Sequence, residues 1–167
     1  RSSAGAAGAR DESRYSMVRR GPLILWDPVI DGESYFQELL RTNLSTQLAV
    51  FGKVQESREV LMERIRSGGT ANVDGYEIGL PLLESCARQN LLPAGGLSHE
   101  GATLVVQIAA NDKAKLREDL QALARGTANA SFERAIEQPF WREIKHFYRR
   151  AENLQGITLQ WLERQGV

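Results

Sequence analysis

The sequence predicts a mixed α/β fold with a small parallel sheet of about three strands. Two apolar runs, Leu23–Trp26 and Thr103–Ala110, carry this prediction, because continuous apolar segments bounded by polar residues are typical of strands buried on both faces. A shorter segment, Ser131–Ile136, alternates apolar and polar residues and is the third predicted strand. Helical patterns separate these segments, so we expect parallel strands joined by helices.

Two acids follow the first predicted strand. Pro28 and Gly32 end the strand pairing and open a loop that contains Asp27 and Asp31. Ligands and catalytic groups of open α/β sheets gather beyond the carboxyl ends of the strands. We therefore expect both acids at the functional edge of the sheet.

A helical insert over residues 34–90 separates the first strand from the second. Ser34 is the expected N-cap of its first helix, which runs to about Phe51 and ends at Gly52. The apolar residues at helical spacing in this helix are Tyr35, Phe36, Leu39, Leu40, Leu44 and Leu48.

The rest of the insert holds two helices and a hairpin. The helices are expected over about 56–66 and 80–89. Between them, residues 70–78 alternate around Asp74-Gly75, and this dipeptide is a strong signal for a two-residue hairpin turn.

After the insert, the order of strand and helix repeats. The second strand ends at the polar pair Asn111-Asp112 and leads to a helix over about 114–125. The third strand leads through the loop 138–141 to a final helix over about 152–164. This order is that of a parallel α/β sheet.

The bulk composition excludes several classes of protein. Lys and Arg number 21, as do Asp and Glu, so no overall charge attracts nucleic acid, and we expect no nucleic-acid partner. The single cysteine, Cys86, excludes an internal disulfide and a cysteine-rich zinc site. No apolar run approaches the length of a membrane span and no secretory pattern is present, so we expect a cytoplasmic protein without membrane contact. No spacing indicates a metal site or a cofactor.

Residues 1–20 differ from the rest of the chain. They are rich in Ala, Gly, Ser and Arg and have little apolar periodicity. We expect either a flexible lead or a partly ordered helix of small residues. Residues 21–167 then form a single α/β domain that carries the insert.

Several segments together resemble a known family. The run 23–32 reads LILWDPVIDG and is followed by YFQELLR at 35–41. With the V-x-G-Y-x-I core of the hairpin, Pro139-Phe140-Trp141 and the segment 158–162, these runs resemble the α/β-hydrolase proteins associated with exosortase and exopolysaccharide systems. The likeness covers residues 21–162 and implies the C-terminal half of such an enzyme, a partial α/β-hydrolase-type sheet with a helical insert.

The resemblance also implies where a catalytic acid lies. Asp112 matches the usual acid position of the family and Asp27 an alternative one; for both, a solvated carboxylate or a cap at the strand end is the other interpretation. The family's nucleophile lies in a G-x-S-x-G turn, which this sequence does not contain. Its histidine follows the last strand, and neither His99 nor His146 fits that position.

We therefore expect a degenerate or partial α/β-hydrolase-like protein that acts as a binding or scaffold module and is not an active hydrolase by itself. The missing nucleophile turn and the misplaced histidines favour this interpretation. The alternative is an ester or amide hydrolase subunit that a missing N-terminal half or a partner chain completes. The resemblance to a family of hydrolases favours that alternative.

A small-molecule ligand is a further expectation. An apolar pocket with a few acids is the usual small-molecule site. The aromatic residues expected to line it, where the insert covers the carboxyl ends of the strands, are Trp26, Tyr35, Phe36, Phe140 and Trp141. The same spacing also fits residues of an ordinary core.

A homodimer through the strand 23–26 is the expected assembly. In the hydrolase sheet the matching strand is internal, and its neighbour is missing here. A bare apolar edge exposes unpaired N–H and C=O groups and invites pairing with another chain. The alternative is that residues 1–20 cover this edge and keep the protein monomeric.

Overall fold

The computed structural model divides into two compact units, which we describe separately. A sheet unit comprises the chain up to Pro28 and from Leu92 onward, and a helical unit comprises Val29–Leu91. The residues that the structure describes are 20–73, 75–92, 97–137 and 150–167. The predicted N-terminal lead, residues 1–20, lies outside them except for Arg20.

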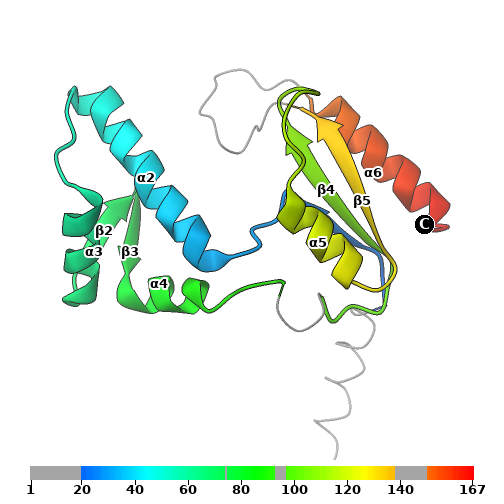
Figure 1. Cartoon of the computed structure of the whole chain (residues 1–167), viewed down its shortest axis with the longest axis horizontal. Coiled ribbons are helices and arrows are strands. Elements are labelled where there is room, and N and C mark those ends of the chain that lie inside the picture. Colours follow the sequence, from blue (N-terminus) through cyan, green and yellow to red (C-terminus); the bar gives the residue numbers. More distant parts are fainter. Residues whose placement is uncertain (1–19, 74, 93–96, 138–149) are drawn as a thin grey trace, which may run out of the picture. The chain divides into compact units, whose positions relative to one another are not determined.

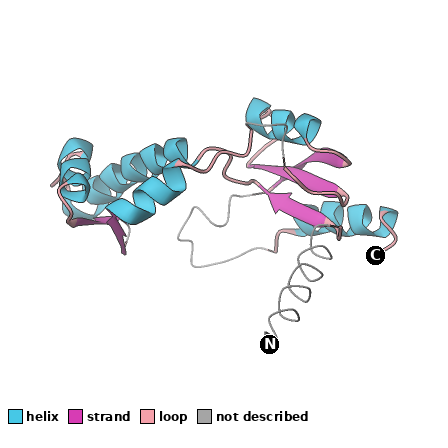
Figure 2. Cartoon of the chain, turned by 90° about the horizontal axis from the view of Figure 1, so that it is seen from below, coloured by secondary structure: helices cyan, strands magenta, loops and turns pink. Residues whose placement is uncertain are grey.

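Three parallel strands form the sheet unit: β1 (Leu23–Trp26), β4 (Thr103–Ala109) and β5 (Ala130–Ile136). They lie in the order β1-β4-β5. The helices α5 (Glu118–Gly126) and α6 (Glu152–Arg164) cover opposite faces of this sheet (Figure 2). The predicted mixed α/β class with a three-stranded parallel sheet is confirmed.

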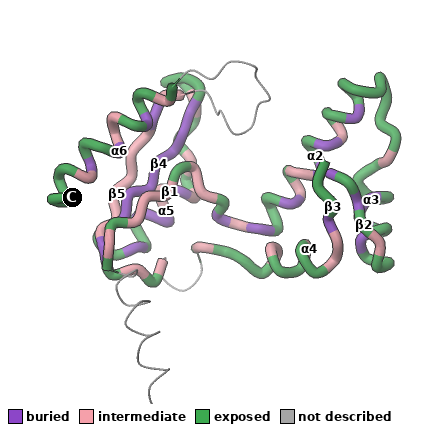
Figure 3. Tube along the Cα trace, turned by 180° about the vertical axis from the view of Figure 1, so that it is seen from behind, coloured by how far each residue is buried: buried purple, intermediate pink, exposed green. Residues whose placement is uncertain are grey.

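The central strand β4 is buried along its whole length (Figure 3). Leu104, Val106 and Ile108 form a cluster with Leu154 and Trp161 of α6. The alternate residues of β4 point to the other face, where α5 contacts β4 and β5. The buried residues of α5 are Leu120, Leu123 and Ala124. A strand between two helical layers explains the continuous apolar run in the sequence.

The first strand differs from its prediction as a strand buried on both faces. Leu23, Ile24 and Leu25 are only half-buried, and Trp26 is 47% exposed. Among the described strands β1 pairs with β4 alone, so it lies at an edge of the sheet. Four apolar residues do not distinguish an edge strand from a central one, because the distinction depends on neighbours distant in sequence.

The helix after β4 begins later than predicted. The expected range was 114–125, and α5 begins at Glu118. The amide of Gln107, on β4, holds the preceding segment in a loop: its Nε2 donates to the Lys115 carbonyl (2.9 Å) and its Oε1 accepts from the Arg117 N–H (3.0 Å). These contacts replace the first helical turn.

The helical unit contains the insert elements in the predicted order (Figure 1). They are α2 (Gly32–Phe51), α3 (Arg58–Arg66), β2 (Thr70–Val73), β3 (Tyr76–Gly79) and α4 (Leu80–Ala87). Their common core consists of Phe36, Leu40, Leu61, Met62, Ile65, Ala71, Val73 and Ile78. None of the described helices, in either unit, is both long and apolar enough to cross a bilayer.

The predicted hairpin and the predicted end of α2 are confirmed. Strands β2 and β3 pair antiparallel with Val73 opposite Tyr76. Gly75 in the turn has φ 91°, whereas Asp74 lies outside the described residues. Gly52 ends α2 at φ 70°, a left-handed conformation that favours glycine.

The N-cap of α2 is Asp31, and the prediction of Ser34 as N-cap was wrong. The Asp31 carboxylate accepts a hydrogen bond from the Ser34 N–H at 2.6 Å, which lowers the pKa of Asp31 below its ordinary value. The helix begins at Gly32, where a Cβ atom would lie 1.9 Å from the Cys86 carbonyl oxygen. Only glycine permits this close approach of α2 to α4.

Candidate functional site

Asp27 lies directly after β1, at the carboxyl end of the sheet. Its N–H donates to the Val106 carbonyl (2.7 Å), which extends the pairing with β4 by one residue. Its φ of 43° falls in the left-handed region, where non-glycine residues are uncommon. The side chain is 6% exposed. Unusual backbone conformations such as this one cluster at functional sites, which makes Asp27 a candidate site residue.

One arginine joins this carboxylate to a second one. Arg117 Nη1 donates to Asp27 Oδ1 at 3.1 Å. Its Nε and Nη2 donate to the two oxygens of Asp119 at 3.1 and 2.6 Å. We call Asp27, Arg117 and Asp119 the Arg117 clamp. It ties the end of β1 to the start of α5.

The electrostatics of the Arg117 clamp favour the charged forms of Arg117 and Asp119. The hydrogen bond to Asp119 raises the pKa of Arg117 further above its already high ordinary value. The same bond lowers the pKa of the Asp119 carboxyl. The guanidinium uses Nε, Nη1 and Nη2 on the two carboxyl groups. Such an arrangement holds the end of β1 and the start of α5 in place.

Sequence reasoning did not find Arg117 and Asp119, because both fall within the helix predicted over about 114–125 and belong to no motif. The available signal was Gln107, a single amide in an otherwise apolar and buried strand. A buried amide needs partners, and its partners are backbone groups of the loop that positions Arg117.

Asp112, the other candidate acid, is exposed in the turn after β4. Within the part of the chain that the structure describes, no hydrogen bond or ion pair joins Asp112 to the Arg117 clamp or to His99. The two candidate acids thus have different surroundings: Asp27 is buried and paired, and Asp112 is solvated.

His99 lies at the opposite end of the strands. Its Nε2 is 2.8 Å from the carbonyl oxygen of Gly21, which precedes β1. The four residues of β1 span about 13 Å at 3.3 Å per residue. The structure therefore does not bring His99 together with Asp27. His146 lies outside the described residues.

The predicted ligand pocket takes residues from both units. The Trp26 indole N–H donates to Thr158 Oγ1 of α6 at 3.1 Å in the sheet unit. Phe36 is buried in the core of the helical unit, and the Tyr35 ring packs against it edge to face. Phe140 and Trp141 lie outside the described residues. This pocket stays a prediction.

The described residues contain no cluster typical of a metal site. Over the described ranges, no three His, Cys, Asp or Glu side chains gather in an arrangement that could hold a metal ion. Comparisons with protein-family models, with curated proteins and with solved structures found no match for this chain.

Proposed function

We propose that this chain acts as a binding or scaffold module with an α/β-hydrolase-like core and is not a hydrolase by itself. The position of His99 carries the proposal. A catalytic histidine contacts both an acid and a nucleophile, whereas His99 binds Gly21 at the amino end of β1 and Asp27 lies at its carboxyl end. Asp27 is also engaged by Arg117 and is not free to orient an imidazole.

The hydrolase-like part of the proposal rests on the sequence resemblance. The parallel order β1-β4-β5, with the helical unit inserted between β1 and β4, is compatible with it. In this proposal the Arg117 clamp has a structural role, because it fixes the loop at the strand ends where a ligand of an α/β sheet would bind.

The test is an esterase assay on the purified chain with a short-chain nitrophenyl ester. We expect no hydrolysis above the buffer rate, because triad members act as a unit and the loss of one removes most of the acceleration. Hydrolysis that Asp112→Asn abolishes and the exposed control Glu118→Gln retains would contradict the proposal. That result would support the alternative of a hydrolase subunit.

We also propose that the chain forms a homodimer through the free edge of β1. Leu23 and Asp27 donate their N–H groups to β4. Backbone groups alternate in direction along a strand, so those of Ile24 and Trp26 point to the free edge. A second copy of the strand can pair there across a two-fold axis.

Two prolines limit the length of that contact. Pro22 and Pro28 occupy the next positions in the same alternation, and neither has an N–H group. Only the N–H groups of Ile24 and Trp26 are available as donors between them. The proposed interface is therefore a short strand pair that needs side-chain contacts to be stable.

Size-exclusion chromatography with light scattering tests the dimer. We expect Ile24→Pro to dissociate it, because this change removes one of the two donors, and the matched variant Ile24→Val to keep it. Far-UV circular dichroism checks that Ile24→Pro retains the fold. A wild-type monomer at all concentrations would rule the dimer out.

A further inference from the structure

The helical unit contains a groove of about 550 Å³ between α2 and the start of α3. All its lining residues belong to this unit, so it is independent of the Arg117 clamp and of the function proposed above. The lining residues are Ser34, Gln37, Glu38, Arg41, Leu44, Val54, Ser57, Arg58 and Glu59. Along α2 it extends from Ser34 to Leu44, about 15 Å at 1.5 Å per residue.

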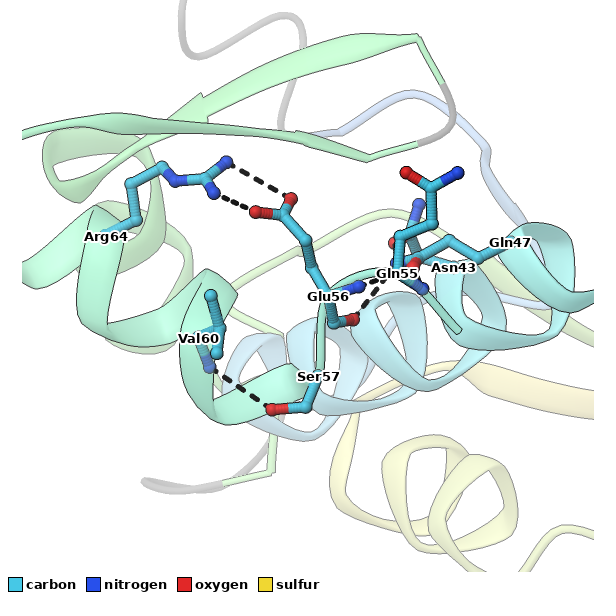
Figure 4. Close-up of polar contacts among 7 residues, drawn as sticks. All are labelled: Asn43, Gln47, Gln55, Glu56, Ser57, Val60 and Arg64. Atoms are coloured by element: carbon cyan, nitrogen blue, oxygen red, sulfur yellow. Dashed lines mark hydrogen bonds and ion pairs between the residues drawn. The ribbon is translucent and has the colours of Figure 1, made fainter. Parts of the chain in front are cut away.

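A buried amide holds the two walls of the groove in position (Figure 4). Gln47 Oε1 accepts from the N–H groups of Gln55 (2.8 Å) and Glu56 (3.0 Å). Gln47 Nε2 donates to Asn43 Oδ1 (2.8 Å) and to the Glu56 carbonyl (3.2 Å). The loop between α2 and α3 is thus fixed to α2, and a preformed groove loses little conformational entropy when it binds a ligand.

One charge in the groove has no direct partner. Glu38 forms an ion pair with Arg41. The Glu59 carboxylate is held by its own backbone N–H and by Ser57, which lowers its pKa. Among the described residues the Arg58 guanidinium forms no hydrogen bond or ion pair, and it has a coulombic interaction with Glu59. An unpaired guanidinium in a groove is a binding group for a carboxylate or a phosphate.

The side-chain amide of Gln37 is also incompletely bonded. Its Oε1 is buried and has no hydrogen-bond partner within the described chain. Buried acceptors without partners are uncommon in folded proteins. Gln37 lies in the groove wall, but a carboxylate or phosphate has no donor for this oxygen, so the oxygen does not contribute to the binding of an anion.

The other part of the groove is apolar. Leu44 and Val54 line it. Leu48 and Phe51 follow Leu44 on the same side of α2, at i+4 and i+7, and are 55% and 56% exposed. An aliphatic chain lying on Leu44 and Val54 would lie beside this exposed apolar surface.

We propose that this groove binds an amphipathic organic anion, with its carboxylate or phosphate at Arg58 and its aliphatic chain along Leu44 and Val54. The polar and apolar parts of the groove match the two parts of such a ligand. The recessed position between two helices favours a free molecule over a lipid within a bilayer.

Calorimetric titration of the full chain tests the proposal with four probes. Octanoate and octyl phosphate are expected to bind. Acetate and octyltrimethylammonium are not expected to bind, because acetate lacks the aliphatic chain and octyltrimethylammonium carries a positive charge. Arg58→Gln and Val54→Ser are each expected to weaken octanoate binding about tenfold. Arg58→Gln removes a charge-assisted contact with the carboxylate, and Val54→Ser removes an apolar contact with the aliphatic chain. Arg66→Gln, on the same helix but outside the groove, should leave the affinity unchanged.

Several results would overturn the proposal. One is an affinity for octyltrimethylammonium equal to that for octanoate. Another is an unchanged affinity of Arg58→Gln for octanoate. The third is a protein that binds phosphatidylglycerol vesicles but does not bind octanoate. Arg58 and Val54 are exposed, so both variants should keep the wild-type melting temperature and remain informative. The esterase assay does not depend on this groove, so the two proposals can fail separately.

Discussion

Asp27 and Asp112 follow neighbouring parallel strands, yet they differ in burial, in backbone conformation and in their ion-pair partners. Asp27 has a buried side chain, a φ of 43° and an arginine partner, and Asp112 is exposed. The difference comes from Arg117, which reaches Asp27 from the loop before α5. At the scale of residues, the burial and pairing of an acid therefore depend on which side chain from a distant part of the chain contacts it.

Asp119 provides a prediction about pH. Arg117 holds the pKa of Asp119 below its ordinary value of 3.8, so the native state binds this proton less readily than the unfolded state does. The stabilisation is full above pH 3.8 and is lost as the pH falls through the lowered pKa. Asp119→Asn should lower the free energy of unfolding at pH 7 by about 1 kcal/mol or less, because the pair is partly exposed.

Urea unfolding between pH 7 and pH 2.5 measures this effect. The difference between wild type and Asp119→Asn should shrink in the acid range. Glu118→Gln, whose ion pair with Lys115 is exposed, serves as the control and should show no comparable pH dependence. A difference that stays constant down to pH 2.5 would refute the role assigned to the Asp119 carboxylate.

At the scale of elements, packing decides where a helix begins. Asp31 and Ser34 are both good N-cap residues, and the local sequence favours neither strongly. The contact between Gly32 and the Cys86 carbonyl brings the start of α2 against α4, so the helix starts at Gly32. Likewise Gln107 shortens α5 by holding the preceding residues in a loop.

The loop between α2 and α3 gives a prediction about stability. Gln47→Ala leaves the N–H groups of Gln55 and Glu56, which are only partly buried, without their side-chain acceptor, and a lost hydrogen bond of this kind costs about 0.5–1.5 kcal/mol. We expect a loss of that size in urea unfolding and weaker octanoate binding. Thr46→Ala, exposed on the same helix, should change stability by less than about 0.5 kcal/mol. Equal effects of the two variants would contradict the role of Gln47.

At the scale of the whole molecule, the strands and the helices of the insert were predictable from the sequence. The bounds of β1 match the prediction, and those of β4 and β5 differ by one residue at one end. The apolar pattern of β1 did not by itself predict an edge strand, because half-burial depends on which neighbours a strand finds. The expectation of a bare edge came from the family resemblance. Among the described strands, β1 has a neighbour on one side only.

The sequence by itself determined the elements of this protein, because apolar periodicity, glycine turns and capping residues act over a few neighbouring residues. Only the tertiary structure decided its candidate sites. The contact between Arg117 and Asp27 joins residues 90 positions apart, and that between His99 and Gly21 joins residues 78 positions apart. Local patterns contain no information about such contacts, because they form only when distant segments pack together.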